Sequence, residues 1–340
     1  MAPRAMLLAA GFGTRLESLT TLRPKPMLPV CGRPLVEWGA RWLASHGIED
    51  VTVNLHHLGS MIEEHLVGLD DLGLRVHFSH EEGEILGTGG GLLRARPSLD
   101  AGDGSPIVIA NGKIITDIDL QAALSFHREG GFEATMVLRE DREGVWKGAL
   151  QRTTDGRLGA LMGDELANAV LDPTPMMFTG VHIIEPSMLD RIPRTGAPCV
   201  VRTAYREAFR AGTLGAFVSS AYWWEHSTVE RYVHGMVNVL SGAVTRPWWD
   251  HDLRGEMLER ARAHGVQVTG PVWMDDDIHV APGAEFAGGV QLERRCRLRE
   301  GIRINRGIVW SGADVDTDFE AGVWTRAGLT GGVSAESIRR

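Results

Sequence analysis

A six-residue repeat in the last third of the chain constrains the fold more than any other feature of the sequence. Small or branched apolar residues recur every six positions, and a second apolar series follows two residues behind on the same period. The two series are Val272, Ile278, Ala284, Val290, Cys296, Ile302 and Ile308, and Met274, Val280, Phe286, Leu292, Leu298, Ile304 and Trp310. Two inward positions and a frequent glycine turn per repeat are typical of one face of a three-sided parallel β-coil. The repeat therefore predicts a left-handed parallel β-helix from about residue 270.

The first half of the chain alternates strand-like and helix-like segments. Short apolar runs predict strands at 5–10, 51–55, 74–79, 107–110, 134–138, 180–184 and 216–219. Helical patterns cover 34–46, 59–67, 120–129, 228–240 and 253–264. Alternating βαβ units imply an α/β fold, here a Rossmann-like and mostly parallel sheet with helices on both faces.

These two patterns predict the domain organisation. We expect a nucleotide-binding type of α/β domain over residues 1–245, a linker with a connecting helix over 246–269, and the β-helix over 270–340. Parallel sheets bind ligands beyond the carboxyl ends of their strands, so the loops that follow the strands are the first place to look for a site.

Charge and cysteine content exclude several classes of protein. The formal net charge is −9, whereas a protein that binds nucleic acid or a membrane surface usually presents a basic face. No apolar run is long enough to span a bilayer. The three cysteines, Cys31, Cys199 and Cys296, lie far apart and form no CxxC, which favours reduced core thiols. We therefore expect a cytoplasmic protein with no nucleic-acid or membrane partner.

The densest local motif follows the first predicted strand. It reads LAAGFGTRL over residues 8–16 and RPKPMLP over 23–29, which matches neither a P-loop nor a dinucleotide-binding fingerprint. Glycines after a buried strand let backbone N–H groups approach phosphate oxygens. Arg15 and Lys25 supply positive charge for a polyphosphate, and two prolines fix the chain around Lys25. The alternative is a glycine-rich turn with incidental basic residues.

This motif resembles the signature of the sugar-1-phosphate nucleotidyltransferase family, most closely its mannose-1-phosphate guanylyltransferase type. Segments 84–92, 178–182 and 223–228 resemble the family's base-recognition loop, sugar-pocket strand and acidic metal motif. The resemblance implies catalytic roles for Arg15 and Lys25. It implies nucleotide binding by Leu8, Ala10, Gly11, Gly13, Thr14, Gly87, Thr88, Gly89, Asn111 and Lys113, sugar binding by Thr179 and Gly180, and a metal ligand at Glu225. Taken alone, segment 84–92 also fits a helix N-terminus capped by Thr88.

The sequence departs from the family where the chemistry takes place. The family pattern is Asn-Gly-Asp, with the aspartate on Mg²⁺, but this chain has Lys113 after Asn111 and Gly112. An ammonium repels a metal ion, so the Mg²⁺ that the family uses is in doubt here. Four explanations stay open. Lys113 replaces the metal as a tethered cation; Asp117 or Asp119 holds the metal instead; the domain binds nucleotide without turnover; or Lys113 is a solvated surface lysine.

The resemblance thus leads to two functional hypotheses. The first is transfer of a nucleotidyl group from an NTP, with GTP favoured, to a mannose- or heptose-like sugar 1-phosphate, releasing pyrophosphate. The second is a catalytically impaired homologue that binds an NDP-sugar as a regulatory or assembly subunit. In either case the β-helix is a plausible surface for a homo-oligomer or a paralogous partner.

Overall fold

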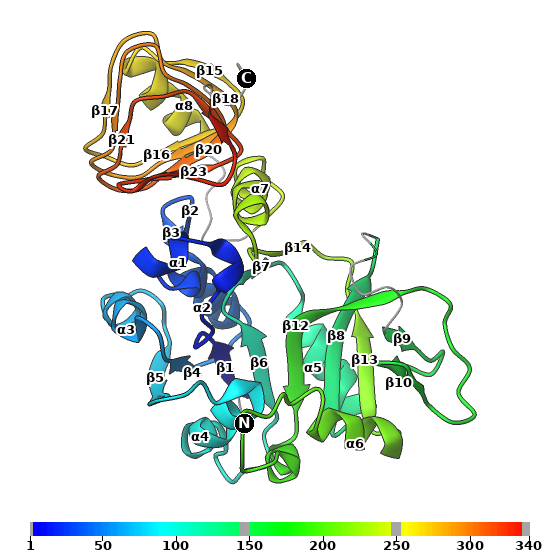
Figure 1. The fold of residues 1–340 in the computed structure, drawn as a ribbon. Coiled ribbons are helices and arrows are strands. Elements are labelled where there is room, and N and C mark those ends of the chain that lie inside the picture. The colour runs from blue at the N-terminus through cyan, green and yellow to red at the C-terminus, as the bar shows by residue number, and fades with distance from the viewer. Residues whose placement is uncertain (1–2, 143, 145–149, 246–252, 335–340) are drawn as a thin grey trace. The chain divides into compact units, whose positions relative to one another are not determined.

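The computed structural model describes residues 3–142, 144, 150–245 and 253–334, which form two compact units (Figure 1). The sheet unit comprises residues 1–11, 36–112 and 118–223. The C-terminal unit comprises residues 12–35, 113–117 and 224–340. Two short segments of the first half, including most of the glycine-rich motif, therefore group with the C-terminal residues. The division at residues 245 and 269 stays a prediction, and part of the expected linker, 246–252, lies outside the described residues.

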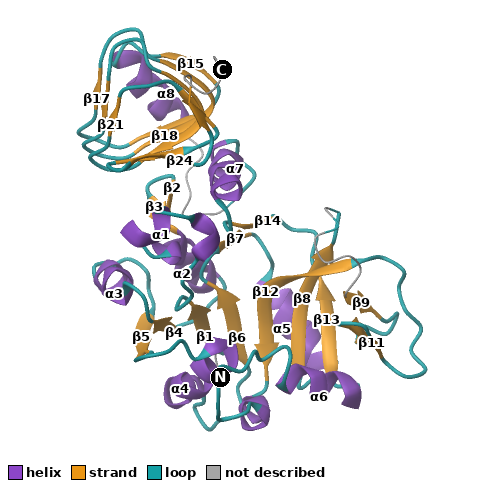
Figure 2. Cartoon of the chain, viewed as in Figure 1, coloured by secondary structure: helices purple, strands orange, loops and turns teal. Residues whose placement is uncertain are grey.

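A mixed ten-stranded sheet forms the centre of the sheet unit (Figure 2). Its strands are β1 (Arg4–Leu8), β4 (Asp50–Leu55), β5 (Arg75–His80), β6 (Ile107–Asn111), β8 (Ala134–Glu140), β9 (Leu150–Arg152), β10 (Leu158–Leu161), β11 (Asp164–Glu165), β12 (Met176–Ile184) and β13 (Leu214–Val218). Strands β6, β1, β4 and β5 are parallel neighbours, as the alternating pattern predicts. Strand β12 runs antiparallel between β6 and β8, and β13 pairs in parallel with β8. The α/β fold is confirmed, with a mixed rather than wholly parallel sheet.

Helices pack on this sheet and bury its apolar side chains. They are α2 (Leu35–Ser45), α3 (Gly59–Val67), α4 (Gly87–Leu99), α5 (Leu120–Glu129), α6 (Ala204–Ala211) and the 3-10 helix η3 (Pro186–Arg191). Side chains of α4, α6 and η3 join those of β1, β6 and β8 in one buried apolar cluster. The sequence patterns predict α2, α3 and α5 to within a residue or so, but not α4 or α6. Glycines crowd the first turn of α4, and they obscure its apolar periodicity.

The C-terminal unit combines the glycine-rich motif with a helix and the repeat. Its short elements are η1 (Thr14–Leu16), α1 (Leu19–Leu22), η2 (Lys25–Met27), β2 (Pro29–Val30), β3 (Arg33–Pro34) and β7 (Ile114–Thr116). Strand β14 (Trp223–Glu225), which begins one residue before this unit, pairs with β7. Helix α7 (Val229–Leu240) follows, and the Thr228 side chain accepts the Arg231 N–H as its N-cap.

The C-terminal strands pair in parallel with partners further along the chain. They are β15 (Gln267–Thr269), β16 (Val272–Met274), β17 (His279–Val280), β18 (Glu285–Leu292), β19 (Arg297–Leu298), β20 (Arg303–Val309), β21 (Asp314–Val315), β22 (Phe319–Glu320), β23 (Val323–Thr325), β24 (Gly328–Thr330) and β25 (Val333–Ser334). We call residues 267–334 the repeat region. Val272 pairs with Val290 and Glu285 with Arg303, a spacing of 18 residues, or three six-residue repeats. At the end of the region, β24 pairs antiparallel with β23, and β25 pairs antiparallel with β22.

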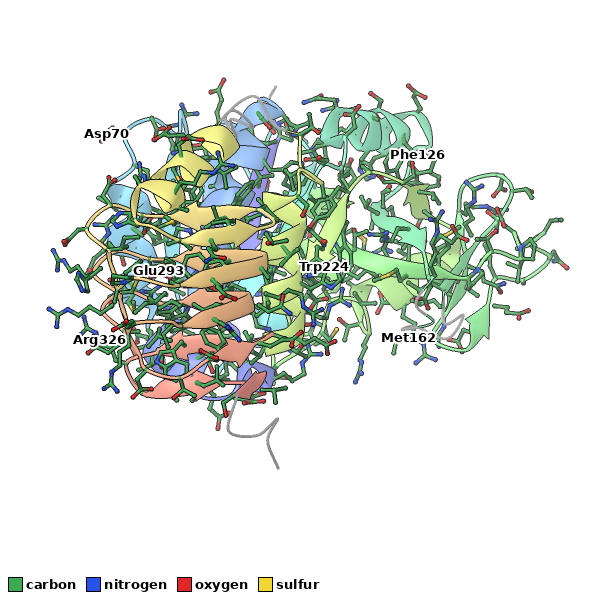
Figure 3. The ribbon with its side chains drawn as sticks, turned by 90° about the horizontal axis from the view of Figure 1, so that it is seen from above. Asp70, Phe126, Met162, Trp224, Glu293 and Arg326 are labelled. Carbon is green, nitrogen blue, oxygen red and sulfur yellow. The ribbon has the colours of Figure 1, made fainter. Side chains whose placement is uncertain are left out.

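The interior of the repeat region holds most of the apolar side chains that the repeat points inward. All of the residues in the two predicted series are buried except Ile278, which is partly buried. Helix α8 (Leu253–Ala263) covers one end of this interior with Met257 and Ala261, and Figure 3 shows the helix lying across the stacked strands. The connecting helix predicted at 253–264 is therefore present.

The prediction that Ile308 and Trp310 point into this interior is wrong. Left-handed backbone corners follow every six residues up to Gly301, but the next corner is Arg306, five residues later. The pairing shifts with it, because Gln291 now faces Ile308 and Leu292 faces Val309. Val309 therefore takes the inward position. Ile308 and Trp310 are buried on the outer face instead. Because they are apolar as well, the sequence pattern did not reveal that this repeat is one residue shorter than the others.

Within the described residues no helix is long and apolar enough to cross a membrane. All three cysteines are free thiols, and two of them, Cys31 and Cys296, are buried.

A charge placed inside the repeat region tests its packing. Ile302 is 4% exposed and belongs to the interior cluster, so Ile302→Asp buries an unpaired carboxylate at a cost of several kcal/mol. We expect loss of the cooperative unfolding transition of the C-terminal unit in calorimetry. The control His279→Asp places the same charge on an exposed position whose strand neighbour is Arg297, and it should leave the transition in place. Equal stability of both variants would contradict the inward assignment of Ile302.

Candidate functional site

The loop after β1 is anchored at its base and open at its tip. The Leu8 carbonyl accepts the Gly112 N–H at 3.0 Å, and the Ala9 N–H donates to Asn54 Oδ1 at 2.7 Å. Ala10 is buried, whereas Gly11 is exposed and has open space where a side chain would stand. A ligand can therefore approach the backbone at Gly11 closely, as phosphate binding by a glycine-rich loop requires.

Gly13 fits its position for two reasons. Its φ of 68° lies in the left-handed region, and a Cβ there would stand 3.2 Å from the Lys25 side chain. Removing the Cβ lets the loop pack on the stem of Lys25. The turn of η1, which contains Thr14, then leaves Arg15 exposed, and Arg15 forms no ion pair within the described part of the chain.

Lys25 is the buried cation of the site. It opens η2 between two prolines and is only 8% exposed. Its carbonyl accepts the Leu28 N–H at 3.1 Å, but within the described residues its ammonium has no hydrogen-bond or ion-pair partner. Burial and then the positive charge of Lys113 lower the pKa of Lys25 to about 8; Glu225 opposes this shift and Arg15 adds to it. Cations held this close without a matching number of carboxylates are stabilised by a bound polyanion.

Lys113 is not a solvated lysine in this structure, because its ammonium donates to Glu225 Oε1. Burial acts to raise the pKa of Glu225, but the charge and hydrogen bond of Lys113, with Lys25 and Arg15, outweigh burial and lower it. The carboxylate is therefore ionised and already paired. The residues at the two positions where the resemblance implies metal ligands thus form an ion pair with each other.

His226 holds the backbone of Lys113 in place. Its backbone N–H and its ring Nδ1 both contact the Lys113 carbonyl, at 3.1 and 3.2 Å. The ring is fully buried, and burial lowers the pKa of His226 to about 3, so the imidazole is neutral. A neutral Nδ1–H donates to the carbonyl, which fixes the tautomer.

These residues do not fit a magnesium ion. Mg²⁺ requires free oxygen ligands, but Glu225 is neutralised by Lys113, whose ammonium stands at the position of the expected aspartate. The two substitutes suggested by the sequence are engaged elsewhere: Asp119 accepts the Ala122 N–H as the N-cap of α5, and Asp117 accepts the Thr245 N–H. Across residues 3–142, 144, 150–245 and 253–334, no group of three or more His, Cys, Asp or Glu side chains is arranged to hold a metal.

The predicted base-recognition loop forms the start of α4 in the sheet unit. Gly87 has a φ of 69°, and a Cβ there would meet the Ala197 carbonyl at 2.8 Å. The Gly89 N–H donates to the Pro198 carbonyl at 2.8 Å, and Thr88 Oγ1 accepts the Val200 N–H at 3.0 Å. Thr88 is therefore not the N-cap of the helix, which is Leu86. The loop is held by segment 197–200, which the sequence did not connect with it.

The predicted sugar-pocket residues lie at an irregularity of β12. The Thr179 hydroxyl donates to the Val137 carbonyl at 2.7 Å and is buried within the sheet. Gly180 has a φ of 79°, and any side chain there would overlap the Asn111 amide. Gly180 therefore allows Asn111 to lie against β12, and the contribution of Thr179 to a pocket would come from its backbone.

Sequence reasoning missed a buried polar network behind these loops. Asn54 Nδ2 donates to Glu81 Oε1 at 2.7 Å, and Glu81 Oε2 accepts the Leu86 N–H at 2.9 Å. Together with the Ala9 contact, this network connects the loop after β1 with the loop before α4 inside the sheet unit. A polar residue at the end of an apolar strand, as Asn54 is, was the available signal.

Comparisons with known proteins show which proteins this chain is similar to. The model of the nucleotidyl transferase family matches residues 4–151. The chain is 27% identical over 314 residues to a mannose-1-phosphate guanylyltransferase of Mycobacterium tuberculosis, spanning 92% of this chain and 81% of that protein. It is 24% identical over 325 residues to a UTP–glucose-1-phosphate uridylyltransferase of Synechocystis, spanning 90% and 82%. A solved UDP-glucose pyrophosphorylase from Acinetobacter baumanii shares the fold, with a TM-score of 0.61 at 15% identity over 76% of this chain and 100% of that one.

Removal of the exposed cation tests the phosphate loop. Arg15→Ala should weaken nucleoside triphosphate binding by about 1.5–3 kcal/mol, the range for a hydrogen bond to a charged group. Isothermal titration calorimetry measures this change. Arg128→Ala removes an exposed arginine on α5 and should leave the affinity unchanged. Unchanged affinity in Arg15→Ala itself would remove this residue from the site.

The pKa of Lys25 predicts a pH dependence. Anion binding requires the protonated ammonium, whose population falls as the pH rises through about 8. Nucleotide affinity should therefore be about tenfold weaker at pH 9 than at pH 7, and binding near pH 8 should take up protons. Lys25→Arg keeps its charge throughout this range, so its affinity profile should be flat. A flat profile for the unaltered protein would contradict this role.

Proposed function

The chain belongs to the sugar-1-phosphate nucleotidyltransferase family, and from this we propose that it transfers a nucleotidyl group from an NTP to a sugar 1-phosphate. The observation that carries the proposal is the cluster of Arg15, Lys25 and Lys113 within the C-terminal unit, with Glu225 as the carboxylate paired within it. Such a cluster favours a polyphosphate.

The chemistry needs positioning and charge neutralisation rather than a protein nucleophile. A phosphate oxygen of the sugar 1-phosphate attacks the α-phosphorus of the NTP and forms a new P–O bond. The bond from the α-phosphorus to the bridging oxygen breaks, and pyrophosphate leaves with that electron pair. Negative charge grows on the departing phosphates, where Arg15 and Lys25 would stabilise it.

We propose that Lys113 supplies a fixed positive charge at the position where the family has a metal-binding aspartate. A lysine ammonium is a compact charge suited to phosphate oxygens, and the Lys113 backbone is held by His226. Glu225 would then orient the ammonium instead of ligating a metal. On this proposal, turnover does not depend on Mg²⁺.

Nucleotide and sugar choice rest on similarity. The relation to a mannose-1-phosphate guanylyltransferase supports GTP and a mannose- or heptose-like sugar 1-phosphate as substrates. We further propose that residues 270–340 form a left-handed parallel β-helix that mediates assembly of a homo-oligomer or with a paralogous partner. The parallel pairing at 18-residue spacing within the repeat region supports the coil.

The Lys113–Glu225 pair also supports a second candidate function. It removes both expected metal ligands while leaving the glycine loop, Arg15 and Lys25 intact. A protein altered in this way could bind an NDP-sugar without turnover and act as a regulatory or assembly subunit, because descent does not guarantee activity.

Lys113→Asp separates the two functions. Pyrophosphate release is measured with GTP and sugar 1-phosphates, in Mg²⁺ and in EDTA. If Lys113 replaces the metal, the native protein releases pyrophosphate in Mg²⁺ and in EDTA, whereas the activity of Lys113→Asp requires Mg²⁺. If the native protein is silent, it binds nucleotide without turnover, and Lys113→Asp should create Mg²⁺-dependent activity by providing a carboxylate beside Glu225.

The matched control is Lys113→Asn, which has the shape of aspartate without its charge. It should not show Mg²⁺-dependent turnover under either function. Native activity that EDTA abolishes would contradict both, and absence of any nucleotide binding would contradict the family function itself.

A further inference from the structure

The segment that carries Lys25 is fixed on both sides by the repeat region, within the C-terminal unit. On its N-terminal side, Arg23 donates two hydrogen bonds to Glu293, at 3.0 and 2.8 Å. Glu293 directly follows β18, and its side chain is 8% exposed. Figure 3 labels this residue among the stacked strands of the repeat region. The Arg23 guanidinium also lies over the Trp310 ring at 4.6 Å. This two-bond geometry restricts both the position and the plane of Arg23.

On the C-terminal side, Gln291 of β18 bridges the turn that follows Lys25. Gln291 Oε1 accepts the Cys31 N–H at 2.7 Å, and its Nε2 donates to the Pro29 carbonyl at 3.1 Å. The Tyr232 hydroxyl donates to the same carbonyl at 2.7 Å. Gln291 is fully buried, so these bonds are not replaced by water when the turn moves.

We infer that Glu293 and Gln291 of the repeat region are positioning residues for the nucleotide-binding segment, so that the repeat region forms part of the working site rather than a separate appendage. Lys25 lies two residues after Arg23 and four before Pro29, and the intervening prolines leave little slack between these anchors. Displacing either anchor therefore displaces Lys25. The inference rests on the proposed function, since it assigns a role in binding NTP.

The electrostatics agree with this geometry. Burial raises the pKa of Glu293 more strongly than Arg23 and the Ser311 N–H lower it. A carboxylate buried this deeply stays charged only with its partner in place. Loss of the Arg23–Glu293 pair would therefore free the Arg23 side chain and leave the buried Glu293 carboxylate without its cation.

Glu293→Gln tests the inference, because it keeps the size of the side chain and removes its charge. We expect the dissociation constant for GTP to rise about 5- to 150-fold, the range of a typical coupling between sites, with the secondary structure unchanged. Hydrogen exchange of residues 12–31 without ligand should become faster. The matched control is Glu285→Gln, which neutralises a partly exposed carboxylate at the start of β18 that pairs with Arg303. It should leave both the affinity and the exchange unchanged.

Should Glu293→Gln fail to fold, Arg23→Lys gives the same test, because it keeps the charge but loses the two-bond geometry. Unchanged GTP affinity together with unchanged exchange at 12–31 would overturn the inference. If the native protein binds no nucleotide, the proposed function fails. Hydrogen exchange of residues 12–31 then decides whether Glu293 positions this segment. Faster exchange in Glu293→Gln then supports the positioning role, and equal exchange refutes it.

Discussion

A carboxylate can be buried only if another charge or several donors hold it, and Glu293 meets this condition through Arg23 and the Ser311 N–H. This contact is one of several that join the glycine-rich motif to the C-terminal unit, although the motif lies near the start of the chain. The Lys25 segment has little regular structure of its own. Its conformation comes from the hydrogen bonds that Gln291 and Tyr232 make with the turn after it.

The same unit concentrates positive charge at the position where the resemblance to the family implies a metal. Lys113 and Glu225 neutralise each other, and the remaining cations Arg15 and Lys25 have no carboxylate of their own within the described residues. Burial first, and then the positive charge of Lys113, lower the pKa of Lys25, because an ammonium that is buried near other cations loses solvation and meets repulsion. The two proposed functions, metal-free transfer and nucleotide binding without turnover, both start from this arrangement. They differ in whether the transition state is stabilised as well as the ground state.

The sequence predicted the elements whose signal is local. Strands such as β4 and β6 are short apolar runs, and α3 and α5 start and end where their apolar spacing and caps place them. Prediction from the sequence failed where packing against residues distant in the chain decides the local structure. Helix α4 begins in a run of glycines that segment 197–200 holds, and Thr88 serves that contact rather than the cap. In the repeat region, Ile308 keeps the six-residue spacing but pairs with Gln291, because the corner at Arg306 comes one residue early and shifts the pairing.

By itself the sequence determined the α/β pattern, the period of the repeat and the presence of Lys113 in place of an aspartate, because periodicity, turn residues and charge are properties of local segments. Only the tertiary structure decided that Lys113 meets Glu225, residues more than a hundred positions apart, and that His226 holds its backbone. It also decided that Arg23 meets Glu293. Such pairs depend on which strands become neighbours, and the register of neighbouring strands is set by the packing of the whole unit.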